Sequence, residues 1–316
     1  MSGVWRLVPF AAVLVVVPLF GSAYLTSVAI IVALHALPAL GLSLVMGFAG
    51  QISLGHAAFY GLGAYGSALL ALRLGLSPWL ATPLAMAAAG LVAYGLGWSI
   101  FRLRGHHLAL ATLGLGIVAS IGFVELRGLT GGSIGLSGIP AYRVIGLDFG
   151  SDTAFFFLVW GVAALVFIAA GNLVDSPAGL AIRGLGDSER GAASLGVDVV
   201  RLKCRIFALG AMLAALGGAL YAHYIGFISP QPFGVGFSIK LLVMVAIGGF
   251  RSIGGVLAGV AFATAVTEPL QDLGYYDVVV FGVLLAVITI FCPAGLLQAL
   301  SDGLRRSWRT VAPRGG

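Results

Sequence analysis

The chain has 316 residues, of which 60% are hydrophobic and 9% are charged. A soluble domain carries about 25% charged residues, so this composition excludes an ordinary soluble domain and indicates an integral membrane protein. The net charge of +6 does not indicate a nucleic-acid partner, because the basic residues collect at the ends of apolar runs. The 48 glycines fit membrane helices, whose backbones pack closely where glycine is present.

Ten apolar stretches are candidates for membrane-spanning helices, which need about 20 mostly apolar residues. They are 7–25, 28–47, 57–72, 79–101, 107–124, 153–171, 205–225, 238–249, 253–267 and 278–298. The pair 238–249 and 253–267 forms either two tilted spans or one re-entrant hairpin around Arg251, so we expect about eight to ten helices. The sequence predicts an all-α integral membrane protein, with residues 1–316 in a single transmembrane domain.

The first stretch has features of a signal peptide, because Arg6 precedes it and the small residues Gly21, Ser22 and Ala23 follow. We expect an uncleaved helix, since the apolar part is long, no A-x-A cleavage site follows, and the next span begins almost at once.

Charge placement predicts the orientation of the chain. With the N-terminus inside, thirteen basic residues fall in cytoplasmic segments and four fall outside, at Arg73, Arg127, Arg143 and Lys240. The positive-inside rule predicts such an excess of basic residues on the cytoplasmic side. We therefore expect both termini and the segment 172–204 to face the cytoplasm.

The stretch GFAGQISLGHAAFYGLGAYG surrounds Gln51, Ser53 and His56 with glycines. Such glycine density opens a helix or lets neighbouring helices approach to backbone contact. An opened helix offers free N–H groups that can hold a carboxylate, so these residues, with His35 in the preceding span, are candidates for a substrate path. The alternative is that they only tie packed helices together. The stretch GGFRSIGGVLAGVAFATAV weakly resembles this one, which is compatible with the inverted repeats of transporters.

The stretch TGGSIGLSGIP has the glycine content of a phosphate cradle, but it lacks lysine and lies on the predicted outer face. Thr130, Gly131, Gly132 and Ser133 are therefore candidates for an outer loop near a substrate entrance, or for the docking surface of a binding protein. An ordinary flexible loop is the alternative.

The charged segment SPAGLAIRGLGDSERGAASLGVDVVRLK interrupts the apolar chain at residues 176–203. Ser176 before Pro177 predicts the start of a short helix, because the hydroxyl can accept a free N–H and proline has none to satisfy. We expect this helix to be broken by Gly184 and Gly186.

A second short helix is expected from Asp187 as its cap, with Glu189 in its first turn, where the helix dipole favours negative charge. Gly196 is expected to adopt the left-handed conformation that ends such a helix, and Asp198 to cap the helix that re-enters the membrane. The small residues of the tip, GAASLG, would fit a groove on a partner protein. A solvated loop is the alternative.

Four regions together resemble the branched-chain amino acid permeases of the LivM/LivH type. The order of these motifs along the chain is similar to that of the LivM type. They are GFAGQISLGHAAFYGLGAY, RGHHLALATLG with TGGSIGLSGIP, the segment 176–203, and GGALYAHYIGFISPQPFG. The charged segment is similar to the coupling loop, or EAA loop, of ATP-binding-cassette (ABC) importer permeases. Its spacing departs from the general motif, because Glu189 is separated from Ala192 and Ala193, and Gly196 follows Ala193 by three residues.

The resemblance implies the ABC importer permease fold, in the bacterial plasma (inner) membrane, with 172–204 as the cytoplasmic coupling loop. It implies docking on an ATPase through Arg183, Glu189, Ala192, Ala193 and Gly196. The implied partners are a second, LivH-like permease, two ATPase subunits and an extracytoplasmic substrate-binding protein. The implied substrates are branched-chain or hydrophobic amino acids, although members of the family also carry urea, amides or aromatic acids.

The sequence itself supports a separate ATPase. A P-loop needs a lysine directly after a glycine, and neither Lys203 nor Lys240, the only lysines, follows one. We therefore expect a transport subunit and not an enzyme, with no cofactor or metal of its own and with ATP and magnesium on the partner. The alternative, an ion-gradient-driven secondary transporter of a small organic solute, would need intramembrane carboxylates, and the predicted span interiors lack them.

Overall fold

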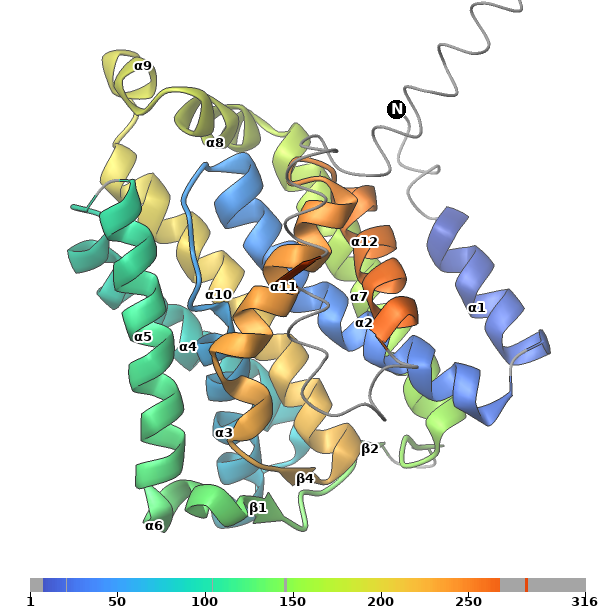
Figure 1. Cartoon of the computed structure of the whole chain (residues 1–316). Coiled ribbons are helices and arrows are strands. Elements are labelled where there is room, and N and C mark those ends of the chain that lie inside the picture. Colours follow the sequence, from blue (N-terminus) through green and yellow to red (C-terminus); the bar gives the residue numbers. More distant parts are fainter. Residues whose placement is uncertain (1–7, 21, 104, 145–146, 268–281, 284–316) are drawn as a thin grey trace, which may run out of the picture.

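The computed structural model describes residues 8–20, 22–103, 105–144, 147–267 and 282–283. These residues form a bundle of helices with two distinct ends (Figure 1). Helices α8 (Pro177–Asp187) and α9 (Glu189–Ser194) cover one end, and strands β1 (Leu136–Ser137) and β4 (Phe227–Ile228) pair at the other. We call them the α8–α9 end and the β1–β4 end.

Six helices of the described chain are long and apolar enough to cross a membrane. They are α2 (Ala23–Leu42) continued by the π-helix η2 (Ser43–Phe48), α3 (His56–Leu74), α4 (Pro78–Ile100), α5 (His106–Glu125), α7 (Asp152–Asp175) and α10 (Val199–Ile225). They confirm the predicted all-α integral membrane protein. Three shorter helices, α1 (Val8–Phe20), α11 (Val235–Gly248) and α12 (Ile253–Thr267), occupy three more predicted spans. The predicted span 278–298 lies outside the described residues.

Short elements complete the described chain. They are α6 (Arg127–Thr130), η3 (Gly132–Ile134), β2 (Arg143–Val144), β3 (Leu147–Asp148) and η4 (Gln231–Phe233). Strands β2 and β3 pair with each other, so the two small sheets are separate.

Helices α11 and α12 form a hairpin that turns at Arg251. At 1.5 Å per residue their 14 and 15 residues span about 21 and 22 Å, less than the roughly 30 Å hydrocarbon core. Their backbones touch, because a Cβ on Gly255 would collide with the carbonyl oxygen of Gly248. The turn between them lies at the α8–α9 end, where Arg251 pairs with the exposed Asp187.

Helix α10 lies at the centre of the bundle and packs against α2, α3 and α4 (Figure 1). Its contact with α3 is backbone to backbone. A Cβ on Gly63 would collide with the backbone of Ala215, and one on Gly218 with the carbonyl oxygen of Tyr60. Close approach of this kind is how small residues hold membrane helices together.

A buried polar network ties the β1–β4 end together. The His223 ring contacts Ser67 Oγ through Nε2 and the Pro140 carbonyl through Nδ1, both at 2.7 Å. Thr82 Oγ1 lies 2.5 Å from the Tyr142 hydroxyl and 3.4 Å from Ser67 Oγ. Burial raises the pKa of Tyr142, so its hydroxyl remains protonated and can donate to Thr82. The network joins residues 140–142 to three helices.

Helix α8 begins as predicted but does not end as predicted. Ser176 Oγ accepts from the Gly179 backbone N–H at 3.2 Å. The helix then continues through Gly184 and Gly186 to Asp187, so the prediction that these glycines break it is wrong. A glycine inside a helix costs only about 1 kcal/mol relative to alanine, and burial of the apolar face of α8 outweighs that cost.

The cap of helix α9 also differs from the prediction. Ser188, and not Asp187, caps it, with its Oγ accepting from the Gly191 N–H at 3.1 Å. Two other predictions are confirmed: Gly196 has a φ of +83°, and Asp198 Oδ1 accepts from the Arg201 N–H at 3.1 Å. Asp187 is instead the last residue of α8, where it is free to pair with a distant side chain.

Candidate functional site

The glycine-rich stretch opens the helix, as predicted. Helix α2 widens into η2, and the chain is then non-helical from Ala49 to Gly55 before α3 begins. The Gln51 N–H donates to the Val45 carbonyl at 2.9 Å and closes the end of the π-helix. Gly50 has a φ of +67°, and a Cβ on it would lie 3.1 Å from the Gly186 backbone, so this break lies directly against α8. Such π-helical segments are frequent at functional sites.

A buried ion pair lies beside this break. Lys203, near the start of α10, has a side chain that is 2% exposed, and its Nζ lies 2.5 Å from Glu189 Oε1. The same Glu189 oxygen accepts from Gln51 Nε2 at 3.4 Å. A buried ammonium needs a charged partner, because desolvation costs several kcal/mol per ion. Glu189 therefore connects the base of α10 to the break between α2 and α3.

Arg251 makes a second connection in the same region. Its Nε donates to the Gly47 carbonyl at 3.0 Å and its guanidinium donates to Asp187 Oδ1 at 2.7 Å. Ser43 Oγ donates to the neighbouring Phe250 carbonyl at 2.8 Å. The five side chains that join these segments form what we call the loop junction: Gln51, Asp187, Glu189, Lys203 and Arg251.

The predicted docking residues of the loop have very different exposure. They are Arg183 and Glu189, both partly buried, Ala192, which is 6% exposed, and Ala193 and Gly196, both exposed. Leu195, which follows α9 at the tip, is 85% exposed. The sequence prediction for the tip considered only its small residues and omitted Leu195. The signal in the sequence was a large apolar residue between Ser194 and Gly196.

The predicted path residues do not converge on one point. Gln51 is part of the loop junction, while Ser53 Oγ lies 3.0 Å from His56 Nδ1 and forms a hydrogen bond with it within the same segment. The His35 ring packs instead on Phe237 of α11, with ring centroids 5.1 Å apart. His35 Nδ1 and His56 Nε2 are buried and have no hydrogen-bond partner within the described residues.

The residues predicted near an entrance form a structured turn at the β1–β4 end. Thr130 Oγ1 donates to the Leu126 carbonyl at 2.9 Å and accepts from the Gly132 N–H at 3.2 Å. Gly131 has a φ of +73°, which glycine adopts without strain. Thr130 and Gly132 are buried, whereas Ser133 is exposed. The exposed tip of this turn is formed by Ser133 and by Ile134, which is 85% exposed.

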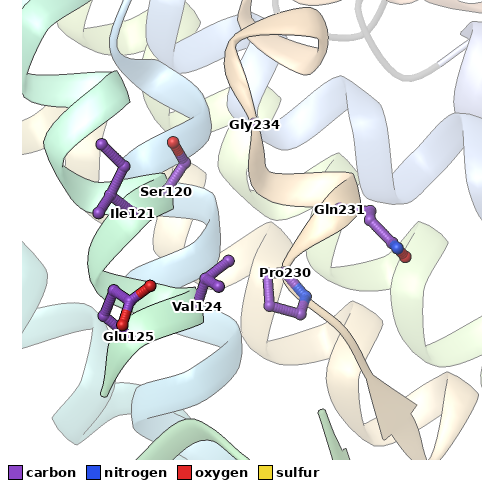
Figure 2. Close-up of a pocket in the computed structure, with 7 residues that line it drawn as sticks. All are labelled: Ser120, Ile121, Val124, Glu125, Pro230, Gln231 and Gly234. Atoms are coloured by element: carbon purple, nitrogen blue, oxygen red, sulfur yellow. The ribbon is translucent and has the colours of Figure 1, made fainter. Parts of the chain in front are cut away.

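A groove of about 330 Å³ lies beside this turn, between α5 and the segment around η4. Figure 2 shows its lining residues, which are Ser120, Ile121, Val124, Glu125, Pro230, Gln231 and Gly234. The Ser120 hydroxyl donates to its own helix at the Ile117 carbonyl, and the Gln231 side chain points away from α5. The Glu125 carboxylate is therefore the main polar group that lines the groove.

Within the described residues, no group of three or more His, Cys, Asp or Glu side chains is placed to hold a metal ion. Cys204 is a buried free thiol, and Cys292 lies outside the described residues.

Comparison with known proteins decides the family. The family model described as branched-chain amino acid transport system / permease component matches residues 24–291. The chain belongs to this family. It is 32% identical to LivM of Salmonella typhimurium, and the match covers 84% of this chain and 68% of that protein. It is also 32% identical to LivM of Escherichia coli K12, where the match covers 88% of this chain and 71% of that protein. LivH of Escherichia coli K12 is 27% identical over 83% of this chain and 91% of its own.

These relatives are high-affinity branched-chain amino acid transport system permease proteins. No solved structure matches the chain. Membership of this permease family, together with the six long apolar helices, makes the chain a multi-pass membrane permease. It does not favour the alternative of an ion-gradient-driven secondary transporter.

Proposed function

We propose that this permease is the LivM-like subunit of an ABC importer and carries branched-chain amino acids across the bacterial inner membrane. A LivH-like permease would line the passage with it. The similarity to both LivM and LivH proteins supports this pairing, because it implies two related permeases that can pack around one passage.

The loop 172–204 would receive the ATPase, and the exposed Leu195 is the observation that carries this assignment. An apolar side chain that is 85% exposed at a loop tip is a candidate anchor for a partner pocket. The base of the loop is held by the buried Lys203, so the tip is presented on a firm support. ATP and magnesium would be bound by two partner ATPase subunits, and the α8–α9 end and both termini would face the cytoplasm, as the charge distribution requires.

The β1–β4 end would then face outward and receive an extracytoplasmic substrate-binding protein. Ser133 and the 85% exposed Ile134 project beside the groove of α5. A Cβ on Gly132 would lie 3.1 Å from the Val124 carbonyl, so the turn and the groove are in contact.

Uptake measurements test the transport class and the substrate. The chain is co-expressed with the proposed partners, a LivH-like permease, the ATPases and the binding protein, and radiolabelled leucine uptake is followed in cells. We expect ATP depletion to stop uptake and an ionophore to leave it unchanged. Isoleucine and valine should compete, while urea, amides and aromatic acids should not. Uptake that collapses with the ion gradient alone would contradict the proposal.

Two equally exposed apolar residues at opposite ends provide a matched pair of variants. Leu195→Asp should abolish co-purification of the ATPase, because it places a charge at the centre of the proposed contact. Ile134→Asp should leave ATPase binding unchanged and should reduce only stimulation by the binding protein. The docking assignment is wrong if Leu195→Asp retains the ATPase at the wild-type level.

A further inference from the structure

The loop junction connects the tip of the loop to the break between α2 and α3 through side chains. Gln51 Nε2 donates both to the Ala49 carbonyl at 2.9 Å and to Glu189 Oε1 at 3.4 Å. Gln51 is 3% exposed, so water does not replace these contacts. Glu189 is the first residue of α9, and α9 leads directly to the exposed Leu195. A short path of contacts therefore runs from the loop tip to the broken helix.

A second path runs in parallel through Arg251. Its guanidinium bridges Asp187, the last residue of α8, and the Gly47 carbonyl in η2. Backbone contact reinforces this path, because a Cβ on Gly186 would collide with the Phe48 carbonyl. The helices of the loop thus hold the end of η2 at two successive points, and no side chain separates them there.

These contacts link the loop to the break. Lys203 is buried, and separating it from Glu189 would leave its ammonium without a compensating charge. Packed interfaces shift as units between discrete arrangements rather than deforming gradually. The non-helical residues between η2 and α3 are the part of this region that can change conformation with the smallest loss of helical hydrogen bonds.

We propose that Gln51 and Lys203 are positioning residues, which transmit a displacement of the α8–α9 loop to the break between α2 and α3 and thereby couple ATP hydrolysis to opening of the passage. This inference rests on the proposed function, because the displacement must come from an ATPase at the loop tip. It assigns Glu189 an internal role as the shared partner of both residues, and not a direct contact with the ATPase.

The test uses the complete complex, reconstituted in lipid vesicles with its partner permease, ATPases and leucine-loaded binding protein. Leucine uptake and ATP hydrolysis are measured in the same vesicles and expressed per assembled complex. Gln51→Met removes both side-chain hydrogen bonds but keeps the length of the side chain and the Lys203–Glu189 pair. We expect leucine uptake per ATP hydrolysed to fall by about tenfold, with the hydrolysis rate and the co-purified ATPase unchanged.

Lys203→Met removes the other partner of Glu189 and serves if Gln51→Met does not assemble. It replaces a buried charge with an apolar chain of similar length, and Glu189, 32% exposed, can then turn to solvent. The same loss of coupling is expected. Arg201→Ala is the control, because it removes an exposed ion pair with Asp198 in the first turn of the same helix. Its uptake per ATP should match the wild type.

Two results would overturn the inference. One is a wild-type ratio of uptake to hydrolysis in the assembled Gln51→Met or Lys203→Met complex. The other is a parallel loss of uptake and hydrolysis in an assembled variant, which would place these residues at the ATPase contact. Failure of the proposed function is distinguishable, since it would appear in the wild type, as a chain that binds no ATPase or takes up leucine without hydrolysis.

Discussion

Removal of the Glu189 carboxylate tests how strongly the loop is fixed to the bundle. In Glu189→Ala the Lys203 ammonium stays buried, with a side chain only 2% exposed, and loses its partner at 2.5 Å. Breaking a buried pair in this way costs about 3–5 kcal/mol. Because Glu189 is itself 32% exposed, we expect the lower part of that range, about 3 kcal/mol.

The assay is equilibrium unfolding of the purified protein in mixed detergent micelles. The double variant Glu189→Gln with Lys203→Met removes both charges and should recover most of the lost free energy, because no buried charge is left unpaired. Arg201→Ala, which removes an exposed pair, should cost less than about 1 kcal/mol. Equal losses in Glu189→Ala and Arg201→Ala, or no recovery in the double variant, would refute the reasoning.

Three further predictions concern packing, capping and the polar network. Gly218→Ala should cost about 1–3 kcal/mol in the same unfolding assay, because its methyl group collides with the backbone of α3, whereas Gly161→Ala, with open space around it, should be neutral or stabilising. Ser188→Ala should cost about 1 kcal/mol by removing the cap of α9, and should speed protease cleavage within the loop. His223→Leu should cost about 1–3 kcal/mol by leaving Ser67 without its 2.7 Å partner, and should speed amide hydrogen exchange in residues 138–142.

The sequence was sufficient wherever the signal is local. Apolar runs located nine of the helices, because a chain in lipid must satisfy its backbone within each helix. Ser176 and Asp198 were identified as caps, and Gly196 as a left-handed terminus, because each depends on a side chain or backbone within a few residues. The same logic failed at Gly184, where distant packing outweighed a local weakness of the helix.

The candidate site depended on contacts that no local pattern contains. Lys203 and Glu189 are 14 residues apart, and Gln51 and Glu189 are 138 apart, so only the stacking of α8 and α9 over the break places them together. From the sequence, Glu189 was expected at the ATPase contact only because the segment 176–203 resembles the coupling loop of ABC importer permeases. Whether a charge is solvated or paired depends on what covers it, and that is a property of the packed bundle rather than of the residues beside it in the chain.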